Sequence, residues 1–130
     1  MSGAHDFIVQ MKSGYDTIIG ERGDSLSGVQ RQKIAISRAM LVNPRILIFD
    51  EATSALDALS EKDVLNAIHQ VRQGRTVLMI AHRLAAVQDA DVILVMHKGS
   101  IVEYGSHQQL MEMNGMYAAM YREQEGRNHA

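Results

Sequence analysis

Two short apolar runs, each following a helical pattern and each ended by polar residues, constrain the fold of this chain most. The runs are Ile46–Phe49, which Asp50 and Glu51 end, and Thr76–Ala81, which His82 ends. A continuous apolar run of this length suits a strand that is buried on both faces. Because helices alternate with these strands, the sequence predicts an α/β fold with a parallel sheet, to which antiparallel strands are added late.

Helical patterns surround the two runs. One spans Ser27–Val42 and stops at Asn43-Pro44, because a proline moves the preceding residue out of the helical region. A second spans Ala58–Gln73, whose apolar residues recur at helical spacing. The other expected elements are a short helix over 4–11, loops over 12–25, a short helix at Leu84–Val87, a hairpin formed by "DVILVM" and "SIVEYG", and a helical tail over His107–Gln124 broken near Asn114-Gly115.

The composition excludes several classes of protein. The 130 residues suffice for one modest domain, and 46% hydrophobic with 22% charged residues is typical of an ordered globular chain. A net charge of -2 gives no general reason to expect nucleic acid as a partner. No cysteine is present for a disulfide or a thiolate metal site. The apolar runs are too short to span a bilayer and no signal peptide is visible, so we expect any membrane role to come through a partner.

Three chemically capable residues follow the predicted strands. Open parallel sheets bind ligands outside the carboxyl ends of their strands, which is where Asp50, Glu51 and His82 lie. A carboxylate there can hold Mg²⁺, and an adjacent one can act as a general base toward water. The alternatives remain open at this point: the acidic pair can simply begin a turn, and a single histidine is usually structural or solvated.

The start of the first long helix has the pattern of a capping box, formed by Ser27 and Gln30. A helix N-terminus attracts phosphate through its N–H groups and dipole, and Gly28 would allow a close approach to the backbone. An ordinary capped helix that binds nothing explains the same four residues. Likewise, Ser54–Asp57 is explained by N-capping of the helix that follows.

The ordered motifs together resemble the nucleotide-binding domain of ABC transporters. They are "LSGVQRQKIAISRAMLVNPRILIFDEATSALD", "TVLMIAHRL" and "ADVILVMHKGSIVEYGSHQQLM", which cover nearly the whole chain. The preceding "GYDTIIGERG" is similar to a loop of the exporter branch. The resemblance implies an ATPase that uses ATP and Mg²⁺ and couples hydrolysis to transport. It also implies a membrane-associated location through transmembrane domains, with the nucleotide side facing the cytosol or an organelle matrix.

The resemblance also implies a role for each matched residue. Glu51 would be the catalytic base, His82 the switch histidine that reaches the γ-phosphate, and Asp50 the Walker B carboxylate that holds Mg²⁺ through water. The signature residues, which would contact ATP held by a second nucleotide-binding domain in a dimer, are Leu26, Ser27, Gly28, Val29 and Gln30. The D-loop at that dimer interface would be Ser54, Ala55, Leu56 and Asp57, and the contact with the transmembrane domains would be Gly20-Glu21-Arg22-Gly23.

The chain departs from the family in lacking the phosphate-binding loop G-x-x-x-x-G-K-[ST]. We therefore expect an incomplete parallel-sheet, P-loop-type ATPase core with part of a helical subdomain. Residues 1–130 would be the C-terminal part of one ABC ATPase domain. Within it, 1–44 would hold the helical subdomain with the signature helix, and 45–130 Walker B, the D-loop, the switch histidine and the C-terminal hairpin and helices. The isolated chain is expected to be inactive as an ATP hydrolase.

A second departure is Val29, where the family signature usually has glycine. A β-branched side chain adopts positive φ only at a cost and adds bulk beside the phosphate, so we expect a weakened signature.

Three functions compete. The first is the ATPase portion of a membrane exporter, and the second is a non-catalytic half-cassette that acts as an interaction module. The third, an ABC-type ATPase of DNA maintenance, is disfavoured by the exporter-like "TIIGERG", the near-neutral charge and the absence of heptads.

Overall fold

The computed structural model describes residues 3–128. By its contacts the chain divides into two compact units, Met1–Ile80 and Ala81–Ala130. Each unit has its own hydrophobic core. The fold is α/β, as the sequence predicts. The predicted subdivision at residues 44 and 45 stays a prediction about the larger domain.

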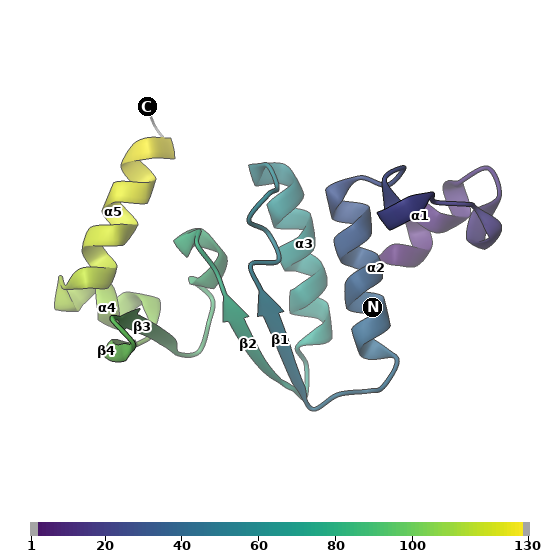
Figure 1. Ribbon diagram of the computed structural model, residues 1–130. Helices are drawn as coiled ribbons and strands as arrows, with labels where there is room; N and C mark the ends of the chain where they lie inside the picture. Colours follow the sequence, from purple (N-terminus) through teal and green to yellow (C-terminus); the bar gives the residue numbers. More distant parts are fainter. Residues whose placement is uncertain (1–2, 129–130) are drawn as a thin grey trace. The chain divides into compact units, whose positions relative to one another are not determined.

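The first unit is built around a β–α–β motif. Its elements are the helices α1 (Ala4–Gln10), α2 (Gly28–Met40) and α3 (Ala58–Val71), the strands β1 (Ile46–Asp50) and β2 (Thr76–Ile80), and the 3₁₀ turns Gly14–Asp16 and Glu21–Gly23. The two strands are parallel, with Ile46 opposite Thr76 and Asp50 opposite Ile80. In Figure 1, α2 and α3 lie side by side and α3 runs along the strand pair. The parallel pairing confirms the prediction from the alternating pattern.

One face of the strand pair forms the core of this unit. Buried side chains from α2, β1 and α3 meet there: Ile36, Leu47, Phe49, Val64, Ala67, Ile68 and Val71. The prediction that Ile46–Phe49 is buried on both faces is wrong for this chain, because Ile46 and Ile48 are 64% and 65% exposed. Successive side chains of a strand point to opposite faces, and among the described residues only one face is covered.

The second unit combines a hairpin with three helical segments. They are the 3₁₀ turn Leu84–Val87, the strands β3 (Ile93–His97) and β4 (Ser100–Gly105), and the helices α4 (His107–Met113) and α5 (Met116–Asn128). The hairpin turn contains Lys98 and Gly99 at φ 48° and 81°, the left-handed geometry that two-residue hairpin turns require. The break between α4 and α5 falls at Asn114, as predicted, and this residue is also left-handed.

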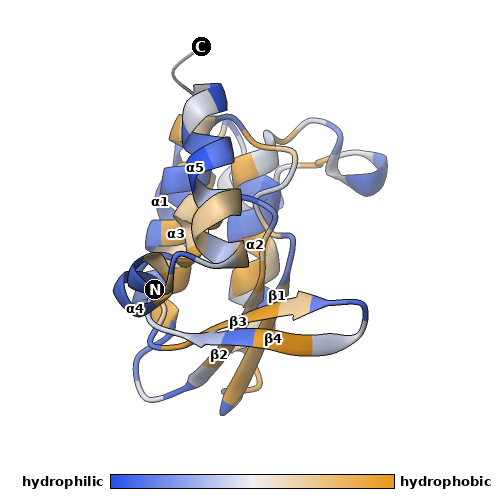
Figure 2. Cartoon of the chain, turned by 90° about the vertical axis from the view of Figure 1, so that its left-hand side faces the viewer, coloured by the Kyte–Doolittle hydropathy of each residue, from blue (hydrophilic) through white to orange (hydrophobic). Residues whose placement is uncertain are grey.

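The antiparallel strands do not extend the parallel sheet. In the part of the chain that the structure describes, β1–β2 and β3–β4 are two separate two-stranded sheets, so the expectation of one mixed sheet is wrong. Ile93 and Val95 of β3 pack with Leu110 of α4 and Tyr117 of α5 in the core of the second unit. Figure 2 shows the hydrophobic character of β1 and β3 along most of their length.

None of the helices described over residues 3–128 is long and apolar enough to cross a membrane.

Tyr117 is the most deeply buried aromatic residue of the second core. It is 1% exposed and its hydroxyl lies 2.8 Å from His107 Nδ1. Burial, assisted by the neighbouring Tyr121, raises the pKa of Tyr117 above its usual value.

Candidate functional site

The two predicted reactive carboxylates stand at the end of β1. Asp50 is the last residue of the strand and is exposed. Glu51 has φ 50°, a left-handed geometry that is uncommon outside glycine. Its N–H donates to Ile80 O at 2.9 Å, so the last residue of β2 fixes the backbone of Glu51. A non-glycine residue held at positive φ costs about 1–2 kcal/mol, and such strain concentrates at functional sites.

The segment that follows is a series of tight turns. Ser54 N–H donates to Glu51 O at 3.2 Å and Leu56 N–H donates to Thr53 O at 3.1 Å. These bonds hold the predicted D-loop residues Ser54, Ala55 and Leu56 close to Glu51. The loop is therefore ordered by its own backbone within unit one.

A buried polar pair, Thr53 and Glu61, ties this loop to α3. Each residue is 7% exposed, and Thr53 Oγ1 donates to Glu61 Oε1 at 2.9 Å. Neither residue was predicted from the sequence to have a role. A signal was available for Glu61, because it lies at helical spacing with Val64, Ile68 and Val71 on the buried stripe of α3. Nothing in the sequence pointed to Thr53 as its partner.

Asp57 closes the loop as the N-cap of α3. Its carboxylate accepts hydrogen bonds from Leu59 N–H at 3.1 Å and from Ser60 N–H at 3.0 Å. The Ser60 hydroxyl donates to it as well, at 2.7 Å. These bonds, those from Ser60 first, lower the pKa of Asp57 below its usual value. The predicted N-capping of α3 is thus confirmed at Asp57, and the dimer-interface role of Ser54–Asp57 stays a prediction.

The N-terminus of α2 carries the capping box that the sequence predicts. Ser27 Oγ accepts from Gln30 N–H at 3.2 Å, and Gln30 Oε1 accepts from Ser27 N–H at 3.0 Å. The first intrahelical bond runs from Arg31 N–H to Ser27 O. Leu26 is 6% exposed, so this signature residue serves as a buried anchor of the segment. The cap holds Ser27 itself exposed at the helix start.

Gly28 brings the signature segment against the D-loop. A Cβ atom at Gly28 would lie 2.8 Å from Leu56 Cδ2, closer than such atoms approach in proteins. The absence of a side chain therefore makes room for Leu56 as well as for any ligand. This contact between the two motifs, which are 28 positions apart in the chain (56 − 28), was not predicted from sequence.

Val29 lies inside the helix. It belongs to α2 and is absent from the residues with positive φ, so the expectation that valine strains the backbone here is wrong. A residue in the first helical turn needs ordinary helical geometry, which valine adopts. Its half-buried side chain packs against the core of the first unit. The effect of its bulk on a nucleotide stays a prediction.

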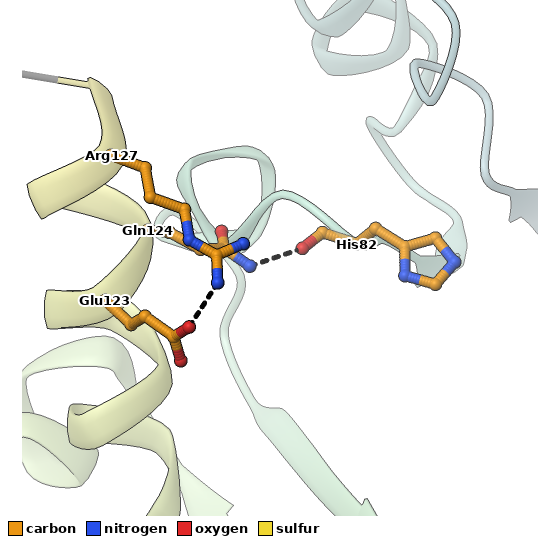
Figure 3. A network of polar contacts seen from close by, with 4 residues as sticks. All are labelled: His82, Glu123, Gln124 and Arg127. Atoms are coloured by element: carbon orange, nitrogen blue, oxygen red, sulfur yellow. Dashed lines mark hydrogen bonds and ion pairs between the residues drawn. The ribbon is translucent and has the colours of Figure 1, made fainter. Parts of the chain in front are cut away.

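His82 lies at the start of the second unit, two residues after the end of β2. It is exposed, and its backbone carbonyl accepts a hydrogen bond from Gln124 Nε2 at 2.7 Å. Gln124 Oε1 in turn accepts from Leu84 N–H at 2.9 Å. Figure 3 shows the His82 imidazole directed away from α5, on the side opposite to the bonded carbonyl.

The carboxylates at the end of β1 are compatible with a magnesium ion whose remaining ligands are water and phosphate oxygens. No group of three or more His, Asp or Glu residues able to hold a metal occurs among residues 3–128. What the chain offers is the exposed carboxylate of Asp50 beside that of Glu51. Mg²⁺ commonly takes one or two carboxylates and completes its shell with water and phosphate oxygens. Asp50 is compatible with that use.

The segment predicted to contact transmembrane domains, Gly20 to Gly23, forms a tight turn in which Gly23 is buried and the other three residues are exposed. Gly20, Arg22 and Gly23 all have positive φ, at 70°, 56° and 71°. Ile18, two residues before the turn, is 92% exposed, and Tyr15 is 68% exposed. The role of this turn and of the exposed side chains before it in binding a partner stays a prediction.

Comparison with known proteins gives a consistent result. The family model described as ABC transporter matches residues 4–54. The leukotoxin export ATP-binding protein of Aggregatibacter actinomycetemcomitans is 54% identical over 123 residues, which are 94% of this chain. The leukotoxin translocation ATP-binding protein of Mannheimia haemolytica and the toxin RTX-I translocation ATP-binding protein of Actinobacillus pleuropneumoniae are equally similar, at 54% over the same share. The chain spans 17% of the length of each of these relatives.

A solved structure agrees in fold. A bacterial Atm1-family ABC exporter with ATP bound superposes with a TM-score of 0.83 at 46% identity, over 95% of this chain and 22% of that one. The likeness therefore covers nearly all of this chain and a limited part of each relative.

Proposed function

We propose that this chain, which belongs to the ABC transporter family as a C-terminal portion of an exporter-type nucleotide-binding domain, supplies the signature, Walker B and switch elements of an ATPase that drives export. The observation that carries the proposal is the contact between Gly28 and Leu56. It joins the capped N-terminus of α2 to the loop that follows Asp50 and Glu51, so the motif residues of the first unit lie at one end of that unit (Figure 1).

The residues of this chain suit phosphoryl transfer to water, which requires positioning and charge stabilisation more than covalent chemistry. Glu51 would orient and deprotonate the attacking water, with its backbone held by the bond to Ile80 O. His82 would donate a hydrogen bond to the γ-phosphate oxygens. The N-terminus of α2, with Ser27 and Gly28, would face ATP held by a second nucleotide-binding domain. Asp50 would hold Mg²⁺, which neutralises phosphate charge when bound.

The proposed partners are a second nucleotide-binding domain and the transmembrane domains of an exporter. The D-loop residues, Ser54 to Asp57, would face the first of these. The turn from Gly20 to Gly23, with exposed Ile18, would contact the second. This assembly would hold the chain at a membrane with its nucleotide side facing the cytosol or an organelle matrix. Because the 130 residues contain no phosphate-binding loop, the chain by itself should release no phosphate from ATP.

A segment exchange tests the proposal. The matching 123 residues of the Aggregatibacter relative are replaced by those of this chain, and phosphate release by the purified chimera is measured. We expect hydrolysis in the chimera and a loss of roughly a hundredfold or more in Glu51→Gln and in His82→Ala, as for removal of a catalytic acid–base group. The matched control is Glu112→Gln, an exposed carboxylate on α4, which should retain full activity. Hydrolysis that is unchanged in Glu51→Gln would refute the assignment.

Val29 is tested in the same chimera. Val29→Gly should raise the rate of hydrolysis if the valine side chain obstructs the nucleotide of the partner domain. An unchanged rate would show that the site accepts valine.

A further inference from the structure

A side chain of α5, that of Gln124, forms two hydrogen bonds with the segment after β2. Gln124, half-buried on α5, donates from Nε2 to His82 O at 2.7 Å and accepts at Oε1 from Leu84 N–H at 2.9 Å. The two bonds connect residues 42 and 40 positions apart. Figure 3 shows Gln124 reaching from α5 to this segment, beside the exposed ion pair of Glu123 and Arg127.

The chemistry of the contact is specific to an amide. One bond requires a donor and the other an acceptor, and glutamine presents both on one planar group. Each bond goes to the backbone, so it fixes the path of the main chain on both sides of Arg83. Leu84 is 8% exposed and packs in the core of the second unit, which gives the segment a second anchor.

Gln124 bonds to the backbone of His82 and not to its imidazole. Gln124 engages the carbonyl of His82, while the ring points away from α5 (Figure 3). A backbone held in this way restricts the positions that the ring can reach. The neighbouring ion pair of Glu123 and Arg127, one and three residues from Gln124, is exposed and screened by solvent.

We propose that Gln124 is a positioning residue for the predicted switch histidine: its side-chain amide clamps the backbone of residues 82–84 so that the His82 imidazole is presented toward the nucleotide. The proposal rests on the proposed function for the role of His82. The clamp itself is independent of that function and is tested separately.

The first experiment measures the clamp in the 130-residue chain by NMR. In the wild type, cross-relaxation should connect the Gln124 side-chain amide protons with the Leu84 amide proton. In Gln124→Leu, protection of the Leu84 amide from hydrogen exchange should fall by about fivefold or more, the factor of one typical hydrogen bond. Protection at Leu110 and Tyr117, in the core of the second unit, should be retained. The control Gln108→Leu removes an exposed glutamine whose side chain bonds to its helix neighbour Glu112, and should leave protection of the Leu84 amide unchanged.

Two results would overturn the clamp. One is Leu84 protection that is equal in Gln124→Leu and the wild type. The other, which needs no variant, is the absence of cross-relaxation between Gln124 and Leu84 in the assigned wild-type chain.

The second experiment measures positioning in the chimera described above. Gln124→Leu should lower kcat for ATP hydrolysis by roughly tenfold with KM for ATP nearly unchanged, because misplacement of a catalytic group affects the transition state. In a His82→Ala background, Gln124→Leu should have no further effect on kcat, whereas a purely structural residue would lower kcat again. A further loss in that background would refute the positioning role. If His82→Ala itself leaves hydrolysis intact, the proposed function fails, and the NMR result still decides the clamp.

Discussion

Replacement of Gly115 by alanine should remove the cap from α5. Glu103 of β4 reaches the start of this helix, where Oε1 accepts from Met116 N–H at 2.6 Å and Oε2 accepts from Tyr117 N–H at 3.0 Å. A Cβ atom at Gly115 would lie 2.0 Å from Glu103 Oε1 and 2.9 Å from Glu103 Cδ. No rotation of the new methyl group relieves that overlap, so the carboxylate has to leave both N–H groups.

The magnitude follows from the two bonds. Loss of a side-chain cap costs about 0.5–2 kcal/mol, and loss of a negative charge from a helix N-terminus adds about 0.3–1 kcal/mol. Alanine offers little compensation, because Gly115 precedes the first residue of α5, where alanine is a poor capping residue. We therefore expect Gly115→Ala to lower the free energy of unfolding by about 2 kcal/mol.

Urea unfolding followed by circular dichroism measures this, with m values compared to verify that the transition is the same. The matched control is Gly126→Ala in the same helix, where a Cβ atom would meet no heavy atom within 4 Å. Since alanine is the better helix former, this control should be neutral or stabilising by up to about 1 kcal/mol. Glu103→Gln should cost about 1 kcal/mol, and it should cost almost nothing further in the Gly115→Ala background. Equal stability of Gly115→Ala and wild type, or additive effects of the two changes, would refute the reasoning.

Three further predictions concern the first unit. Thr53→Val should lower the free energy of unfolding by about 1–3 kcal/mol, because it removes a hydrogen bond to the buried carboxylate of Glu61. The control Thr53→Ser keeps the hydroxyl and should cost less. Equal effects of the two changes in urea unfolding would contradict this. The folded protein has a lowered pKa at Asp57, so the contribution of this carboxylate to stability is present above its usual pKa near 3.8. That contribution is lost as the pH falls through the pKa of the folded state. The urea midpoint should therefore fall less on acidification in Asp57→Asn than in wild type. Val29→Gly should lower stability by about 1–2 kcal/mol, since it removes a side chain packed on the core and puts glycine in a helix; an unchanged midpoint would contradict the observed packing.

Local sequence signals predicted the local structure. The capping box of Ser27 and Gln30, the hairpin turn at Gly99 and the helix break at Asn114 all depend on residues within four positions of one another. The parallel pairing of β1 with β2 followed from the alternation of helices and apolar runs. These features are fixed by backbone chemistry that does not require knowledge of distant contacts.

Three features could not be predicted from local sequence signals. The exposure of Ile46 depends on which layers cover the strand pair, and an apolar run does not say how many layers are present. The fit of Leu56 against Gly28 and the helical geometry of Val29 depend on tertiary packing. The two bonds of Gln124 join residues about forty positions apart, and the residues around Gln124 in the sequence give no sign of such partners.

The loop after β1 and the segment after β2 each bond to a polar side chain from a helix, Glu61 and Gln124 respectively. The free-energy cost of burying these two side chains differs. Glu61 is a carboxylate that is almost fully buried, whereas Gln124 is a half-buried neutral amide. Burial of a carboxylate costs more than burial of an amide, so its hydrogen bonds to partners such as Thr53 are needed for folding itself. Substitutions of Glu61 should therefore act mainly by lowering the free energy of unfolding, and less by moving the loop after β1. Changes at Gln124 should release the segment that carries His82 while the second core persists, because Leu84 and Tyr117 still pack there. We therefore expect position and stability to be separable at Gln124, where the proposed positioning of His82 can be measured without loss of the fold.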